Sequence, residues 1–257
     1  MGKAAAKAIV TRKGGRVLLV SRDESKLSAA REEILAETGA AADAVSFTVL
    51  DARDEVAVQR FASCLPDGAY DGLVVSAAGK APHGPIGELE TSMTAELFNS
   101  KFWTAYHACK HVAPRLADGG AIALVAGVLN RRPGKNCSPL AAVNGALEGL
   151  TRALALEYGP RLRVSCLSPG FCDTERFDTM EPERKAAMLA NTADSLPLRR
   201  VGEPSDMGEA LYYLLSAPFV TGIVLDCDGG HHIRQYASAA TDPMRSGSTS
   251  GAGSTAT

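Results

Sequence analysis

The chain has 257 residues, 46% of them hydrophobic, which is enough to build the core of one large α/β domain. With 27 basic and 29 acidic residues the formal net charge is -2, so electrostatics gives no reason to expect nucleic acid or an anionic membrane surface as a partner. The six cysteines include no Cys-x-x-Cys pair, so we expect no metal site and no redox dithiol, and a small molecule becomes the expected partner.

No apolar run reaches the ~20 residues that are needed to cross a bilayer, and we therefore predict a cytoplasmic protein without a membrane partner. Residues 1–22 carry six basic side chains and no acidic one, a bias that is also typical of transit peptides. Residues 17–20, Val-Leu-Leu-Val, favour a core strand instead.

Taken in chain order, short apolar segments alternate with longer segments of helical spacing. The expected strands are residues 16–20, 44–50, 72–76, 121–125, 162–167 and 222–226. The expected helices are residues 3–15, 24–38, 53–64, 92–116, 138–158, 181–193 and 204–216. This alternation predicts an α/β fold in which helices cover both faces of a parallel sheet, with the ligand site at the carboxyl ends of the strands. We expect one domain over residues 1–236 and a flexible tail over residues 237–257, which are rich in Ser, Gly, Ala and Thr.

The amino-terminal segment allows two interpretations. Ala4, Ala5, Ala8 and Ile9 recur at helical spacing, which favours a helix over residues 3–15. Alternatively, residues 9–20 form a hairpin about the Gly-Gly pair at positions 14 and 15.

Five segments, in order, carry a recognisable pattern. They are residues 72–79 (Gly-Leu-Val-Val-Ser-Ala-Ala-Gly), 119–125 (Gly-Gly-Ala-Ile-Ala-Leu-Val), 146–155 (Ala-Leu-Glu-Gly-Leu-Thr-Arg-Ala-Leu-Ala), 163–170 (Arg-Val-Ser-Cys-Leu-Ser-Pro-Gly) and 221–230 (Thr-Gly-Ile-Val-Leu-Asp-Cys-Asp-Gly-Gly). From about residue 2 to 230 their order and spacing resemble the short-chain dehydrogenase/reductase family. The resemblance implies a Rossmann-like, doubly wound parallel sheet and hydride transfer to or from a small carbonyl or alcohol substrate. It also implies a homodimer or homotetramer paired through the helices at 92–116 and 138–158.

The family begins with a strand and a Thr-Gly-x-x-x-Gly-x-Gly loop. The resemblance matches Gly2 to the last glycine of that loop, which implies that the first, central strand of the sheet is missing here. Its neighbours would then have unpaired backbone groups, and the cofactor pyrophosphate would lack the glycine-rich turn that binds it.

The resemblance also implies a cofactor site, and NADP is favoured over NAD. Arg22 would pair with the 2′-phosphate, Asp51 would bind the adenine amino group with Ala52 nearby, and Asn144 stands where a lysine binds the nicotinamide ribose. Ala77, Ala78 and Gly79 would lie against the ribose, and Pro169, Gly170 and Thr174 match the segment that holds the nicotinamide carboxamide. Other interpretations remain: Arg22 as a solvated arginine paired with Asp23, and Asp51 as a helix N-cap.

The family's catalytic positions are replaced. Its serine, tyrosine and lysine correspond to Gly127, Leu140 and Asn144, and only Asn99 matches the family's helix asparagine. Ser138 is a candidate substitute donor, although a helix N-cap before a proline explains it equally well. Because leucine cannot transfer a proton, two hypotheses follow: a divergent NADP-dependent oxidoreductase, or an inactive relative that serves as a binding or oligomerisation module.

Overall fold

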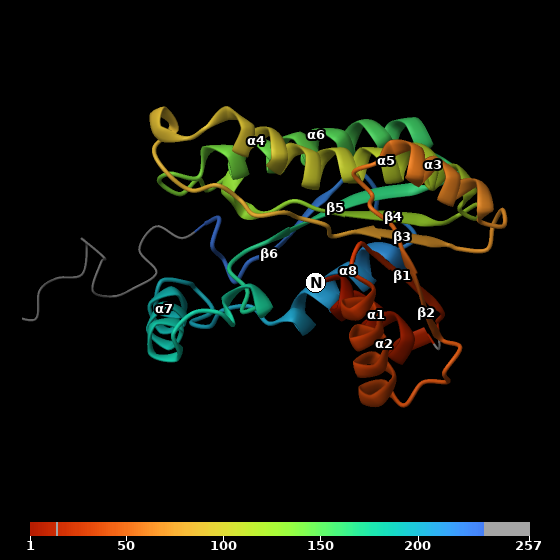
Figure 1. Cartoon of the computed structure of the whole chain (residues 1–257), viewed down its shortest axis with the longest axis horizontal. Helices are drawn as coiled ribbons and strands as arrows, with labels where there is room; N and C mark the ends of the chain where they lie inside the picture. Colours follow the sequence, from red (N-terminus) through yellow and green to blue (C-terminus); the bar gives the residue numbers. More distant parts are fainter. Residues whose placement is uncertain (14, 234–257) are drawn as a thin grey trace, which may run out of the picture.

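The computed structural model describes residues 1–13 and 15–233, and the predicted tail at 237–257 lies outside the described residues. Six strands form two parallel sheets (Figure 1). In the smaller sheet β1 (Val17–Ser21) pairs with β2 (Val45–Val49). The larger sheet has the order β3-β4-β5-β6 and comprises β3 (Gly72–Val75), β4 (Ala121–Val125), β5 (Arg163–Pro169) and β6 (Val224–Cys227). The predicted α/β fold with a parallel sheet is therefore confirmed.

Helices cover both faces of this arrangement (Figure 1). One face carries α3 (Glu55–Cys64), α4 (Thr91–Phe98), α5 (Thr104–His111) and α6 (Ser138–Tyr158). The other carries α1 (Gly2–Lys13), α2 (Glu24–Thr38) and α8 (Pro204–Ser216), whereas α7 (Pro182–Asp194) lies apart, beyond the carboxyl end of β5. Aspartates begin two of these helices: Asp23 accepts a hydrogen bond from the Lys26 backbone, and Asp54 accepts one from that of Ala57.

The amino-terminal segment is a helix, so the hairpin interpretation is wrong. The alanines that recur at helical spacing are buried, because α1 packs on α8 and α2. Gly208 permits this close approach: a Cβ at that position would lie 2.6 Å from the backbone oxygen of Ala4. Within residues 1–13 and 15–233, no strand joins β1 to β3, and the two sheets have separate edges.

The helix predicted over residues 92–116 is interrupted, which corrects the sequence-based expectation. A π-helical segment, Asn99–Trp103, separates α4 from α5, and a 3-10 turn follows at Ala113–Arg115. The wider turn moves the residues after Asn99 out of simple α-helical register. Hydrophobic spacing does not indicate such a turn, because π-helical segments are rare insertions in α-helices. The segment contacts α6.

Most apolar residues of the helices proposed to pair subunits lie in the core of the chain itself. Ala105, Ala108, Leu147 and Leu154 pack with Ile122 and other residues of β4 and β5. The large apolar side chains exposed on these helices are Met93, Trp103, Tyr106 and Leu156. Among the described helices, none is both long and apolar enough to span a membrane.

Candidate active site

The predicted site residues gather at the carboxyl edge of the sheets, where parallel α/β folds bind ligands. Gly2 begins α1 against the end of β3, since a Cβ at Gly2 would lie 2.8 Å from Ser76 Oγ. Lys3 binds Glu175 at 2.7 Å, which ties the start of α1 to the segment that follows β5. The first turn of α1 contains no acidic residue, so its backbone N–H groups and dipole favour an anion.

Arg22 and Asp51 lie at the carboxyl ends of β1 and β2. Arg22 is exposed and contributes to the lowered pKa of Asp51 as a nearby positive charge. It does not pair with Asp23, whose carboxylate caps α2. Within the described part of the chain, the Arg22 guanidinium has no hydrogen-bonded partner, and it is thus available to an anionic group.

Arg53 holds the Asp51 side chain in place. The guanidinium Nη2 donates to Asp51 Oδ2 at 2.7 Å, its Nε lies 3.0 Å from Oδ1, and the Arg53 backbone N–H also donates to Oδ1. The hydrogen bonds from the Arg53 side chain keep the pKa of Asp51 below its ordinary value, although burial opposes them. Asp51 is not the N-cap of α3, because Asp54 has that role. The neighbouring Ala52 carbonyl lies 3.3 Å from His107 Nδ1.

The segments after β3 and β5 lie at the same edge. Ala77 and Ala78 are exposed, and Gly79 approaches Ser100 so closely that a side chain at position 79 would collide with its hydroxyl. Pro169 ends β5, and the Gly170 N–H donates to the Cys227 carbonyl of β6 at 3.0 Å. Thr174 is half-buried and precedes Glu175, the residue bound by Lys3.

Gly127 and Asn144, the positions to which the resemblance assigns the family's serine and lysine, are joined through a buried lysine. Asn144 is 1% exposed, and its Nδ2 donates to the Gly127 carbonyl at 3.1 Å. The Lys101 ammonium donates to Asn144 Oδ1 at 2.6 Å and to the Ala126 carbonyl at 2.8 Å. A side chain on Gly127 would meet the Asn144 amide, since a Cβ there would lie 2.9 Å from Nδ2. Gly127 and Asn144 therefore fit each other sterically.

The remaining predicted catalytic positions do not form one cluster of hydrogen bonds. Asn99 begins the π-helix, and its Nδ2 lies 3.4 Å from Glu96 Oε2. Ser138 is the first residue of α6 and is exposed. Cys137 occupies the N-cap position, so Ser138 is not the cap. Leu140, half-buried on α6, presents only hydrocarbon.

Lys101 was not among the residues predicted from sequence, although its position carried a signal. In the sequence, Leu97, Lys101 and Ala105 recur at a spacing of four, which would place the lysine on the apolar face of a continuous helix. All three residues are buried in the structure. A lysine on such a face is unusual, because burial of an ammonium is costly unless it is hydrogen-bonded. The same helix carries the π-helical turn, a feature that is frequent at functional sites.

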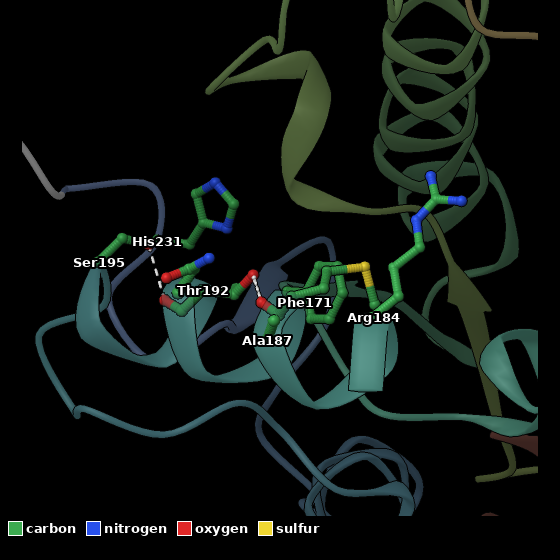
Figure 2. Close-up of a pocket in the computed structure, with 8 residues that line it drawn as sticks. Phe171, Arg184, Ala187, Thr192, Ser195 and His231 are labelled. Atoms are coloured by element: carbon green, nitrogen blue, oxygen red, sulfur yellow. Dashed lines mark hydrogen bonds between the residues drawn. The ribbon is translucent and has the colours of Figure 1, made fainter. Parts of the chain in front are cut away.

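An open depression of about 590 Å³ lies between α7 and the segments that follow β5 and β6 (Figure 2). Phe171, directly after Gly170, stacks on Phe177 with ring centroids 5.2 Å apart. Ala187 and Met188 of α7 add apolar surface, and Arg184, Asn191, Thr192, Ser195 and His231 supply polar groups. The depression thus adjoins the segment that the resemblance assigns to the nicotinamide.

Asp226, Asp228 and His232 come close enough together to be considered as metal ligands. Arg131, however, donates to both carboxylate oxygens of Asp226, and His232 Nδ1 lies 2.8 Å from Asp228 Oδ2. The pKa of Asp228 lies below its ordinary value: burial acts to raise it, but the hydrogen bonds from the His232 side chain and from two backbone N–H groups together outweigh burial. The carboxylate therefore stays charged. Among the described residues this group is an ion-pair network.

Known proteins are similar to this chain in sequence and in architecture. Residues 1–232 match the family described as enoyl-(acyl carrier protein) reductase. The cis-4-hydroxycyclohexanecarboxylate dehydrogenase of Sinomonas cyclohexanicum is 29% identical over 245 residues, 84% of this chain and 96% of the relative. A solved small-chain dehydrogenase in complex with NADPH is 33% identical, with a TM-score of 0.71 over 85% of this chain and 99% of that one. The apo structure of a Pseudomonas aeruginosa PAO1 short chain oxidoreductase with an atypical catalytic center is 25% identical, with a TM-score of 0.77 over 88% and 91% of the two chains. The chain thus belongs to the short-chain dehydrogenase/reductase family of NAD(P)-dependent oxidoreductases.

Proposed function

We propose that the chain binds NADP(H) at the carboxyl edge of its sheets and transfers hydride to or from a small carbonyl or alcohol substrate, without the family's tyrosine as proton donor. The observation that carries this proposal is the convergence of the predicted cofactor residues at one edge. The start of α1, Arg22 and the segment from Pro169 to Thr174 all lie there. The NADPH bound by the 33% identical dehydrogenase supports the choice of cofactor.

The residues present fit NADP(H) by their chemistry. Arg22 offers a partner-free guanidinium, among the described residues, to the 2′-phosphate, and a bidentate pair of this kind is a strong, charge-assisted contact. Asp51, oriented by Arg53, has lone pairs left for the adenine amino group. The helix start at Gly2 would contribute backbone N–H groups to the pyrophosphate, and Pro169, Gly170 and Thr174 would hold the carboxamide. When bound, the cofactor supplies or accepts the hydride.

Proton transfer is where we expect this chain to differ from its family. Position 140 holds a hydrocarbon, and general acid help is worth about 10²- to 10⁴-fold in rate, so carbonyl reduction should be slower by about that factor unless another group donates. Asn99 and Ser138 are the proposed contributors: Ser138 has an exposed hydroxyl two residues before Leu140, and Asn99 would position water.

A second function, binding or oligomerisation without turnover, is favoured by one observation. The Asn144 side chain packs against Gly127, and Lys101 donates a hydrogen bond to it, so no space is left for a side chain at position 127. Leu140 offers no proton donor. The two functions differ in one measurement. Single-turnover oxidation of bound NADPH by a panel of small ketones and aldehydes supports the first, whereas binding without any oxidation supports the second.

The cofactor itself is tested by titration with NADPH and NADH, followed by calorimetry. We expect Arg22→Ala to weaken NADPH about 10-fold or more, because hydrogen bonds to charged groups contribute about 1.5 to 3 kcal/mol each, and to leave NADH unaffected. Arg16→Ala is the matched control, because Arg16 precedes the other end of β1 and pairs with Asp43. Equal affinities of Arg22→Ala and the unsubstituted chain for NADPH would refute the assignment of Arg22.

We further propose a homodimer or homotetramer. Trp103, directly before α5, and Tyr106 of α5 are exposed, and their ring centroids lie 5.5 Å apart in an edge-on contact. Leu156 is exposed near the end of α6. Neighbouring exposed aromatic side chains such as Trp103 and Tyr106 favour association. Light scattering after size exclusion tests this, and we expect Trp103→Lys to yield monomers.

A further inference from the structure

Lys101 is a cation built into the interior of the proposed active site. Only 6% of the residue is exposed, and its ammonium lies between the Ala126 carbonyl, directly after β4, and Oδ1 of Asn144 on α6. The nearby Lys110 of α5 behaves differently, since it is exposed and pairs with Glu55 at 2.7 Å. The surrounding helical segment is thus not buried along its whole length, and the burial of Lys101 is specific to its position.

The ammonium determines how the Asn144 amide is oriented. An ammonium has only donors, so the oxygen of Asn144 must face Lys101 and the nitrogen must face the Gly127 carbonyl. The observed distances, 2.6 Å and 3.1 Å, agree with that orientation. The glycine at 127 leaves room for it, because any Cβ there would lie 2.9 Å from Nδ2. Lys101, Asn144 and the turn after β4 thus form one fixed polar unit.

This unit lies at the carboxyl end of β4, beside β5, whose own end continues into Pro169 and Gly170. A fixed cation at a water-poor site exerts a stronger field than an exposed one, and such preorganised charge stabilises negative charge that develops during reaction. No exposed lysine substitutes for it, because solvent and salt screen surface charges.

We propose that Lys101 is a positioning residue for the nicotinamide half of NADP(H): it fixes the Asn144 amide and provides the positive charge behind it. This inference rests on the proposed function, since it concerns the same cofactor site. Lys101 belongs to the π-helical segment and Asn144 to α6, so their hydrogen bond joins two separate elements.

The test separates the two halves of the cofactor. Adenosine 2′,5′-bisphosphate contains only the adenosine end, so we compare its affinity with that of NADPH for each variant by calorimetry. We expect Lys101→Met to weaken NADPH by about 10-fold or more and to leave the bisphosphate affinity unchanged. Lys101→Arg should restore part of the NADPH affinity, because it keeps the charge. Asn144→Ala should weaken NADPH alone, as Lys101→Met does, and Lys110→Met should change neither ligand.

Each outcome has a defined meaning. Unchanged NADPH affinity in Lys101→Met or in Asn144→Ala would overturn the inference and leave the proposed function intact. A parallel loss of both ligands, with a lowered melting temperature that Lys101→Arg does not correct, would show a purely structural role and would also overturn it. Failure of the unsubstituted chain to bind NADPH would overturn the proposed function and this inference together.

Discussion

A serine at position 127, where the resemblance places the family's serine, should destabilise this chain. Gly127 has φ 153° and ψ 156°, a backbone conformation that is nearly restricted to glycine and costs other residues about 1 to 3 kcal/mol. A Cβ would also lie 2.9 Å from Asn144 Nδ2. Asn144 cannot move aside cheaply, because it is 1% exposed and Lys101 binds its oxygen. Overpacking of this kind costs about 1 to 3 kcal/mol more.

We therefore expect Gly127→Ser to lower the free energy of unfolding by about 2 to 6 kcal/mol. Gly127→Ala should cost a similar amount, because the colliding atom is Cβ and not the hydroxyl. The assay is urea unfolding followed by the fluorescence of Trp103, the single tryptophan, with the denaturant dependence required to stay constant.

Gly149→Ala provides the control, with the opposite sign. Gly149 is an exposed residue inside α6, and a Cβ there meets no atom within 4 Å. Alanine at that position should stabilise the chain by about 0.4 to 1 kcal/mol. A Gly127→Ser loss below about 1 kcal/mol would refute the reasoning, because it would mean that the Asn144 unit yields easily.

Three further outcomes are expected. Gly208→Ala should lower the free energy of unfolding by about 1 to 3 kcal/mol, because its Cβ would overlap the backbone of α1; an unchanged urea midpoint would contradict the close helix packing. Hydrogen bonds from Lys110 and His111 of α5 hold the pKa of Glu55 at about 2, below its ordinary 4.5. The ionised carboxylate therefore stabilises the fold above pH 4.5, and this stabilisation is lost as the pH falls toward 2. The difference in melting temperature between the unsubstituted chain and Glu55→Gln should shrink across that window, and a constant difference would argue against the pair. Burial raises the pKa of Cys109 to about 12, so iodoacetamide at neutral pH should label the exposed Cys64 and spare Cys109 in the native state, as peptide mapping would show.

The sequence by itself determined the element order and the parallel character of the sheets. Hydrophobic periodicity placed every described strand and the helices α1, α2, α3, α6, α7 and α8 within a few residues, since strand and helix patterns depend on local spacing. It predicted one continuous helix where the structure has α4, a π-helical segment and α5. It also predicts a site at the carboxyl ends of the strands, and the resemblance to the family predicts that Gly127, Leu140 and Asn144 replace catalytic residues. These are properties that a linear pattern contains.

Only the tertiary structure decided how those departures fit together. A side chain at position 127 would collide with the Asn144 amide, 17 positions away, and the Lys101 ammonium binds the same amide from 43 positions away. The π-helical turn that precedes Thr104 likewise is not indicated by hydrophobic spacing. A lysine on an apolar helix face is visible in sequence, but what its ammonium binds is set by the positions of β4 and α6. Hydrogen-bond geometry between distant segments is a property of the folded chain.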